Sequence, residues 1–411
     1  MGRETIRRID VFLGIVVCAL LTIARRVVDL VAGQTTRDPP RQVLFLKLIE
    51  QGATVLAGDA IRLAAERVGR DNLYFCVFGE NRFILDVLDL VPANNVLAVR
   101  SDRFDRFVVD VLRVLVRVRR ARLDGVVDME LFSRATAIMA FLSGARVRVG
   151  LHRFTSEAPY RGDLFTHRLQ HNPYLHMAQA YRLLVEALWA DPAETPLMKV
   201  HPAPPPTPPS FVPLAEERER VQEKVKQAAG GAVEGRLVLI NASIGDKLPL
   251  RRWPEACFVE LGRRLLSERL DVTIGLTGAP SEQTAIESLR DKLGPRALCL
   301  AGRTTVRELL ALYTLADVLV TTDSGPGHFA TLTDIESVVL FGPETPVIFG
   351  PLGPRSVAVT ANLACSPCLN AYNHRFSPCR YNACMHAISV DEVLAHVCAA
   401  LDAEPGLRKV N

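Results

Sequence analysis

The chain has 411 residues, of which 49% are hydrophobic and 6% aromatic, and its 49 basic and 45 acidic side chains leave a net charge of +4. This length is enough for two α/β domains, and the hydrophobic fraction excludes a disordered protein. The near balance of charges and the scarcity of aromatic side chains argue against a protein that binds single-stranded nucleic acid, so we predict no nucleic-acid partner.

An N-terminal helix is the first predicted element. The uncharged apolar run Val11–Ala24 is flanked by arginines on both sides: Arg3, Arg7, Arg8, Arg25 and Arg26. A membrane-spanning helix needs about 20 apolar residues, and the arginine pair interrupts the place of a signal-peptide cleavage site. We interpret residues 5–32 as a helix lying in the membrane surface, at the cytoplasmic face of the inner membrane. The alternative is a helix packed on the protein's own surface. On the membrane interpretation, residues 1–32 are removable without loss of the folded core.

Short apolar runs then alternate with helical patterns in each half of the chain. The predicted strands are Val43–Leu48, Leu73–Val77, Asn95–Val99, Gly125–Asp128 and Arg146–Val149, followed by Leu237–Asn241, Asp271–Thr277, Ala297–Leu300, Val318–Thr321 and Ser337–Phe341. Strands that alternate with helices predict parallel sheets. The proline-rich residues 202–210 can form neither helix nor inner strand and predict a stiff connector. The predicted fold class is α/β, with two Rossmann-like domains facing a central cleft.

The predicted domains are an N-terminal helix and linker over 1–40, a first Rossmann-like domain over 41–200, a linker over 201–212 and a second Rossmann-like domain over 213–411. Within the first domain, Asp102–Arg122 is predicted to be a helix with seven arginines: Arg103, Arg106, Arg113, Arg117, Arg119, Arg120 and Arg122. Such a run is most often a solvated helix face. The second interpretation is a face held against anionic lipid.

The turn Thr321–His328 carries the strongest local signal. It follows the apolar run Ala316–Val320 and precedes an apolar helix start, so we expect it between a strand and a helix. Glycines and proline there let the backbone turn sharply, and free N–H groups at a helix start favour a phosphate. The alternative is an ordinary turn in which Asp323 caps the helix.

Several motifs in order resemble glycosyltransferase family 9, the heptosyltransferase family. They are Asp323-Ser324-Gly325-Pro326-Gly327-His328 with Leu340–Pro346, Val43–Lys47 with Gly52, Asp128–Arg134, Leu142–Ala145, Arg148–Gly150, Arg252–Pro254 and Leu276–Pro280. The resemblance runs from about residue 41 to about residue 400, and the combination is more specific than any single motif. It implies the two-domain architecture called GT-B, with residues 41–200 as the acceptor domain and residues 213–411 as the donor domain.

The resemblance also implies where a nucleotide-sugar donor, with ADP-heptose as the best guess, would bind. The implied donor-binding residues are Ser243, Lys247, Arg251, Gly278, Glu282, Asp323, Ser324, Gly325 and His328. An insertion after Ser243 leaves the choice of diphosphate-binding cation open among Lys247, Arg251 and Arg252. Glu282 has the alternative of capping a helix N-terminus. His328 also counts as catalytic, since it could donate to the leaving diphosphate.

The general base departs from the family pattern. Family members often carry Gly-Asp in the first turn, where this chain has Gly52-Ala53, and alanine cannot accept a proton. The candidates, in order, are Glu50, then Glu130, then no base at all. Lys47, Gly52 and Arg134 are implied on the acceptor side, and the acceptor itself would be a cell-envelope glycan or a lipid-linked sugar.

Four of the nine cysteines cluster near the C-terminus, at Cys365, Cys368, Cys379 and Cys384. Two closely spaced pairs can close a tetrahedral zinc site. The alternatives are reduced thiols packed in a loop, or disulfides in an oxidising compartment.

The sequence therefore predicts an inverting, metal-independent glycosyltransferase without a catalytic cofactor, with a possible structural zinc. The competing hypothesis is a scaffold that binds a nucleotide sugar and has lost catalysis, which the alanine at position 53 motivates.

Overall fold

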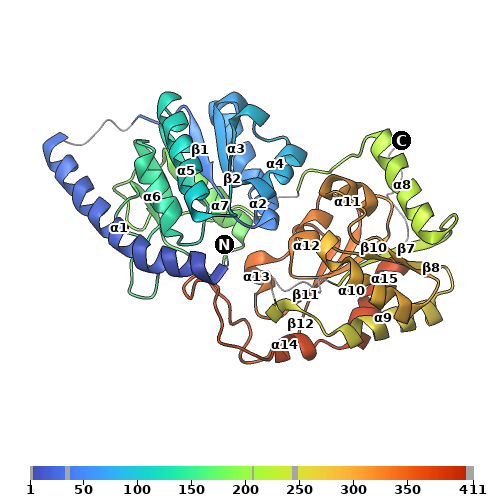
Figure 1. The fold of residues 1–411 in the computed structure, drawn as a ribbon. Coiled ribbons are helices and arrows are strands. Elements are labelled where there is room, and N and C mark those ends of the chain that lie inside the picture. Colours follow the sequence, from blue (N-terminus) through green and yellow to red (C-terminus); the bar gives the residue numbers. More distant parts are fainter. Residues whose placement is uncertain (1–2, 33–37, 206–207, 243–248, 404–411) are drawn as a thin grey trace. The chain divides into compact units, whose positions relative to one another are not determined.

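Two parallel six-stranded sheets organise the chain (Figure 1). The computed structural model describes residues 3–32, 38–205, 208–242 and 249–403. Ser243 and Lys247 of the predicted donor site lie outside the described residues. The chain divides into one unit of residues 1–205 and 370–376 and a second unit of residues 206–369 and 377–411.

The first unit holds a sheet in the order β3-β2-β1-β4-β5-β6. Its strands are β1 (Val43–Leu46), β2 (Leu73–Phe78), β3 (Val96–Val99), β4 (Gly125–Asp128), β5 (Val147–Leu151) and β6 (His167–Leu169). Its helices of six residues or more are α1 (Arg3–Ala32), α2 (Gln51–Leu56), α3 (Gly58–Val68), α4 (Arg82–Leu88), α5 (Phe104–Arg120), α6 (Arg134–Leu142) and α7 (Met177–Glu186). Every residue of β1 and β4 is buried, as expected for inner strands covered on both faces.

One hydrophobic cluster joins α1, α5 and α6 to the same face of this sheet. Cys18 of α1, Val114 of α5 and Ala137 of α6 pack there with Leu44 of β1, and Cys18 has no exposed surface. Helices α3 and α7 pack against each other, and an Arg182–Asp59 ion pair of 2.7 Å links them.

The second unit repeats the strand order of the first. Its sheet runs β12-β11-β10-β7-β8-β9. When the strands are numbered from β7 and the sheet is followed from β9 to β12, this is the order 3-2-1-4-5-6. The strands are β7 (Arg236–Asn241), β8 (Val272–Thr277), β9 (Ala297–Cys299), β10 (Val318–Thr322), β11 (Glu336–Phe341) and β12 (Ser356–Thr360). The helices are α8 (Ala215–Ala229), α9 (Glu255–Glu268), α10 (Gln283–Leu293), α11 (Val306–Tyr313), α12 (Gly325–Ala330), α13 (Pro346–Phe349), α14 (Ala383–His386) and α15 (Val390–Asp402). This repeated order is that of Rossmann folds, and it confirms the predicted α/β fold class.

The N-terminal helix is present, and one side of it packs on the first unit. Gly14, Cys18 and Thr22 form its buried line, and the Thr22 hydroxyl accepts a hydrogen bond of 2.8 Å from the Asp163 N–H. Asp10 lies 3.1 Å from the buried guanidinium of Arg134 in α6. The helix therefore packs into the core of the first unit, as in the alternative of a helix on the protein's own surface, and the removal of residues 1–32 stays a prediction. Among the described residues, no helix is both long and apolar enough to cross a membrane.

Candidate functional site

The strand order of the first sheet reverses between β1 and β4, and charged side chains lie just after the carboxyl ends of these two strands. In open α/β sheets, ligands bind outside the carboxyl ends of the strands at the point where strand order reverses. Strands β1 and β4 are neighbours with Leu46 opposite Asp128. Lys47 directly follows β1, and Glu130 follows β4 by two residues. Both predicted residues therefore stand at the position where this fold places its ligands.

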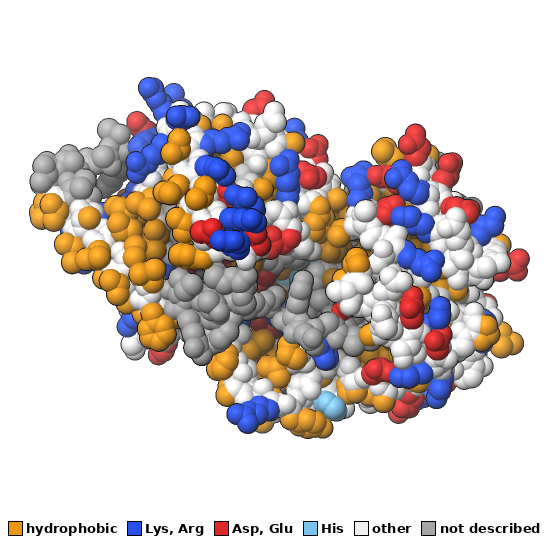
Figure 2. Space-filling model, viewed as in Figure 1, with side chains coloured by type: hydrophobic (Ala, Val, Ile, Leu, Met, Phe, Trp, Pro, Cys, Tyr) orange, Lys and Arg blue, Asp and Glu red, His pale blue; other side chains and the backbone are white. Residues whose placement is uncertain are grey.

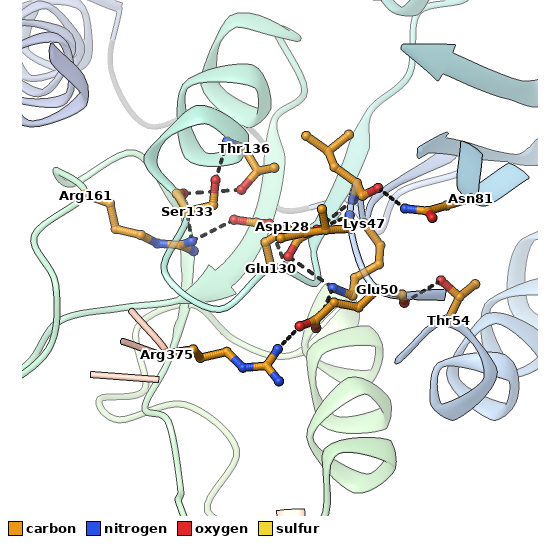
Figure 3. A network of polar contacts seen from close by, with 12 residues as sticks. Lys47, Glu50, Thr54, Asn81, Asp128, Glu130, Ser133, Thr136, Arg161 and Arg375 are labelled. Carbon is orange, nitrogen blue, oxygen red and sulfur yellow. Dashed lines mark hydrogen bonds and ion pairs between the residues drawn. The ribbon is translucent and has the colours of Figure 1, made fainter. Parts of the chain in front are cut away.

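Lys47, Glu50 and Glu130 form one polar network (Figure 3). The Lys47 Nζ lies 3.1 Å from Glu130 Oε2 and 3.5 Å from Glu50 Oε2. Glu130 Oε1 also accepts hydrogen bonds from the N–H groups of Leu48 (2.7 Å) and Ile49 (3.0 Å). Both oxygens of Glu130 are thus held by donors in the first turn.

The two candidate bases differ in access to solvent. The side chain of Glu50 is 34% exposed, whereas that of Glu130 is 6% exposed. Glu50 has a left-handed backbone (φ 72°, ψ 87°), a conformation that non-glycine residues adopt at a cost of about 1–3 kcal/mol and that clusters at functional sites. Gly52 and Ala53, which follow it in α2, are both buried. Glu50 is the more accessible proton acceptor of the two.

A buried ion pair lies behind this network. Arg161 is 3 Å or less from Asp128 at the end of β4, with Nη1 to Oδ2 at 2.9 Å, and neither side chain is more than 1% exposed. Burial raises the pKa of the Asp128 carboxyl, and the Arg161 charge opposes that rise. The guanidinium lies over the Phe165 ring at 4.6 Å and near the Phe132 ring at 5.7 Å. This ion pair holds Asp128, the last residue of β4, in place.

The segment Asn370–Phe376 belongs to the first unit although its neighbours in the chain belong to the second. Its Arg375 forms an ion pair with Glu50 (Figure 3). Its Tyr372 donates a hydrogen bond of 3.2 Å to the His171 carbonyl and contacts the His171 ring edge-on at 5.4 Å. Burial lowers the pKa of His171 to about 4, so this ring stays neutral at physiological pH. The segment therefore supplies a second cation to the candidate base.

The strand order of the second sheet reverses between β7 and β10. In this unit Arg251 lies between two carboxyl groups. Its Nη1 is 3.1 Å from Asp323 Oδ2 and from the Asp323 carbonyl oxygen, and its Nη2 is 3.3 Å from Glu344 Oε1. Asp323 directly follows β10, and Glu344 follows β11 by three residues. The predicted donor-site residues Arg251 and Asp323 are thus brought together.

Burial controls the ionisation of both carboxyl groups. It raises the pKa of Glu344 to about 8, with the Arg251 charge opposing the rise and the Asp323 charge adding to it. Burial also raises the pKa of Asp323, and Arg251 again opposes it. Arg251 is therefore already engaged by protein carboxyls, and one of them carries a proton near neutral pH.

The remaining described donor-site residues line the ends of β8 and β10. Gly325 begins α12, and the Ser324 hydroxyl donates a hydrogen bond of 2.8 Å to the Thr322 carbonyl. His328 is buried in the same short helix. Glu282 Oε2 accepts a hydrogen bond of 2.8 Å from the Ala279 N–H, next to Gly278, which is the capping alternative for this residue.

A family model for glycosyltransferase family 9 (heptosyltransferase) matches residues 111–376, more than half of the chain. The chain belongs to glycosyltransferase family 9. The lipooligosaccharide heptosyltransferase 2 of Haemophilus influenzae is 27% identical over 150 residues, which are 35% of this chain and 42% of that protein. The lipopolysaccharide heptosyltransferase 2 of Salmonella typhimurium is 31% identical over 112 residues, 26% of this chain and 32% of that protein. The matched stretches span less than half the length of these curated relatives.

Solved structures of the same family share the fold over most of the chain. The ADP-heptose lipopolysaccharide heptosyltransferase II of Escherichia coli has a TM-score of 0.65 at 18% identity, covering 88% of this chain and 98% of that chain. A family 9 glycosyl transferase from Veillonella parvula has a TM-score of 0.66 at 16% identity, covering 88% and 97%. These likenesses confirm the predicted GT-B fold.

Sequence reasoning overlooked Arg161 and Arg375 in the charged network of the first unit and Glu344 in that of the second unit. Glu344 lies inside the motif Leu340–Pro346, and its place in that motif was its signal in the sequence. Arg375 carried no signal, because it reaches Glu50 from more than 300 positions away in the sequence. Arg134, predicted on the acceptor side, forms an ion pair with Asp10 and donates a hydrogen bond of 2.7 Å to the Tyr160 carbonyl.

The four clustered cysteines lie in and beside the loop that leaves β12. Cys365 and Cys379 are exposed, Cys368 is partly buried and Cys384 is buried. No group of three or more metal-binding side chains is close enough to hold a metal within the part of the chain that the structure describes. Structural zinc stays a prediction, and metal analysis of protein purified under reducing conditions tests it.

Proposed function

We propose that this chain transfers a heptose from ADP-heptose to a cell-envelope glycan or lipid-linked acceptor with inversion at the anomeric carbon. Membership of family 9 supports a glycosyl transfer, and the names of the relatives supply the sugar and the lipopolysaccharide-type acceptor. In this step an acceptor hydroxyl oxygen bonds to the anomeric carbon, the bond from that carbon to the diphosphate oxygen breaks, and the hydroxyl proton passes to a carboxylate.

The accessible Glu50 carboxylate carries the proposal, because it stands at the end of β1 where the family aspartate is replaced by Ala53. Lys47 and Arg375 hold it by ion pairs, so it is positioned as an ionised proton acceptor. The proposed donor site is in the second unit, around Asp323, Arg251 and His328. The proposal includes metal independence, which activity in excess EDTA tests.

The deciding experiment compares Glu50→Gln with Glu66→Gln, a matched change at an exposed residue of α3. General-base catalysis typically contributes about 10²–10⁴-fold, so Glu50→Gln should lower kcat by that order and leave donor binding unchanged. Transfer is measured over a panel of nucleotide sugars and acceptors, and donor binding by thermal shift. Full turnover in Glu50→Gln, with a deficit in Glu130→Gln, would move the role to Glu130.

A second candidate function is a catalytically inactive scaffold that binds a nucleotide sugar. The ion pairs of Glu50 favour it, because both of its carboxylate oxygens have cationic partners in the protein. Donor binding without transfer or donor hydrolysis across the whole panel would support this alternative.

We further propose that the protein works at the cytoplasmic face of the inner membrane, held there by α1. The outer side of α1 exposes large apolar side chains, among them Phe12 (74%), Leu20 (61%) and Ile23 (61%). Such a helix lies in the interface plane with its apolar face among the headgroups and acyl chains.

A further inference from the structure

Exposed apolar side chains concentrate on two helices of the first unit. Of the 24 large hydrophobic residues that are exposed in the described part of the chain, eight lie on α1 and five on α5. Those of α5 are Phe104, Val108, Val109, Leu112 and Val116. Figure 2 shows hydrophobic side chains gathered over α1 and the neighbouring surface of this unit. Contiguous apolar surface of this kind marks a site that contacts a partner or a membrane.

The two helices share one face of the first sheet. Both pack on the hydrophobic cluster that α6 also joins, and α6 contacts each of them (Figure 1). On α1 the buried line Gly14, Cys18 and Thr22 points to this cluster, so the exposed row points away from it. On α5 the buried residues Val114 and Val118 do the same. The two apolar rows therefore lie on the outer side of a single helical layer.

Arginines accompany the apolar row of α5. A groove of about 540 Å³ on this helix is lined by three apolar and three basic side chains: Val109, Leu112, Val116, Arg113, Arg117 and Arg120. These residues recur at the spacing of one helix stripe. An apolar floor with guanidinium edges suits acyl chains beside phosphate headgroups.

The charge of the chain is concentrated on the same two helices. Their sequences contain ten arginines and five acidic residues, a net charge of +5, while the whole chain carries +4. The rest of the protein is therefore slightly acidic, with a net charge of −1. A second copy of the chain docked symmetrically here would bring like charges together, whereas an anionic bilayer would neutralise them.

We propose that α1 and α5 form one docking face for an anionic lipid bilayer, with α5 as a second contact element. The inference rests on the proposed membrane association of α1 and extends it to the arginine helix. The apolar rows enter the interface, and Arg113, Arg117 and Arg120 contact lipid phosphates. The protein would then be bound to the bilayer that carries a lipid-linked acceptor through two helices instead of one.

Co-sedimentation of the full chain with vesicles tests this proposal. The vesicles are phosphatidylcholine alone or phosphatidylcholine mixed with phosphatidylglycerol. Each basic residue near an anionic surface contributes about a fivefold change in partitioning, so Arg113→Gln with Arg120→Gln should weaken binding to mixed vesicles about 25-fold. Leu112→Gln with Val116→Gln should weaken binding at least about fivefold. Circular dichroism and thermal melting check that each variant folds.

Matched controls lie on the second unit: Arg218→Gln with Arg220→Gln on α8, and Leu270→Gln, whose side chain is 84% exposed. These should bind as the unchanged protein does. If the α5 variants also bind unchanged while Phe12→Gln with Leu20→Gln loses binding, α5 is not a contact and the inference is overturned, but the role of α1 stands. If the unchanged protein does not bind mixed vesicles, the inference about α5 and the proposed membrane role of α1 are both overturned. If the α5 variants alter the sedimentation coefficient without vesicles, the face binds a second copy and the inference is overturned.

Discussion

The Arg251 guanidinium lies between two buried carboxyl groups, and this arrangement decides how they titrate. Sequence reasoning placed Arg251 and Asp323 at the donor site and left the diphosphate-binding cation open among Lys247, Arg251 and Arg252. A single sequence cannot reveal that Glu344 reaches the same guanidinium, because that contact depends on β10 and β11 lying side by side. In the folded protein the cation is shared before any ligand arrives.

Glu344 makes stability depend on pH. Its pKa is about 8 in the folded protein and near 4.5 when unfolded, so between these values the folded state holds a proton that the unfolded state has lost. The free energy of unfolding should therefore fall as pH rises from about 5 to about 8, by up to about 1.4 kcal/mol per pH unit, and level off above.

Glu344→Gln removes the titrating group and should flatten this slope, which urea denaturation at several pH values measures. Glu260→Gln, a change at a side chain that is 58% exposed, is the control and should keep the original slope. An identical slope in both variants would show that Glu344 titrates normally in the folded protein.

At the scale of helices and strands, the sequence predicted all eight inner strands and two of the four edge strands, β3 and β9. The ten predicted strands correspond to strands of the structure because each is an apolar run that is largely buried. The two that were overlooked, β6 (His-Arg-Leu) and β12 (Ser-Val-Ala-Val-Thr), are edge strands with one neighbour each. An edge strand is only partly buried, so its sequence need not carry the apolar signal.

Gly150 in β5 shows why the family motif Arg148–Gly150 ends in glycine. A Cβ at this position would lie 2.6 Å from the Phe165 ring and 2.9 Å from the Arg161 guanidinium. Gly150→Ala should push Arg161 away from Asp128 and destabilise the protein by about 1–3 kcal/mol. Gly231→Ala, where a Cβ would meet nothing within 4 Å, is the control. Equal midpoints of denaturation for the two variants would contradict this role.

Helix α1 is tied to α6 by Asp10, which accepts hydrogen bonds from the N–H groups of Arg134 and Ala135 at 3.0 Å and pairs with the Arg134 guanidinium. Asp10→Ala leaves that guanidinium, 3% exposed, without its carboxylate, and we expect a loss of about 1–3 kcal/mol of stability. Asp38→Ala, at an exposed position in the linker, should change nothing measurable. Differential scanning calorimetry compares them, and an unchanged Tm for Asp10→Ala would restore the picture of a detachable helix.

For the molecule as a whole, the strand order of each sheet reverses between its first and fourth strands. The two charged networks lie at these two points. The sequence predicted both networks in outline, since Lys47 lies near the end of a predicted strand and Glu130, Arg251 and Asp323 follow predicted strands. It could not predict that seven residues near the C-terminus complete the first unit, because no local pattern records so distant a contact.

Tyr372 should therefore stabilise the first unit from a remote part of the chain. Tyr372→Ala removes its ring contacts with His171 and Phe132, at 5.4 and 6.1 Å between centroids. Hydrogen exchange should speed up around these two residues and stay unchanged in β10 and β11. Tyr381→Ala, a residue of the second unit that is 65% exposed, should leave both regions unchanged. If exchange around His171 and Phe132 is as slow in Tyr372→Ala as in the unchanged protein, the segment contributes nothing to the stability of the first unit.

The placement of Asn370–Phe376 has a consequence for building chimaeras between family members. The chain passes from one unit to the other three times, after Pro205, after Leu369 and after Phe376. A hybrid joined only at Pro205 would pair the first unit of one parent with a returning segment inherited from the other parent. Arg375 would then meet a foreign partner at the position of Glu50. Exchanging the first unit therefore requires two separate inserts, residues 1–205 and 370–376, moved together as a set.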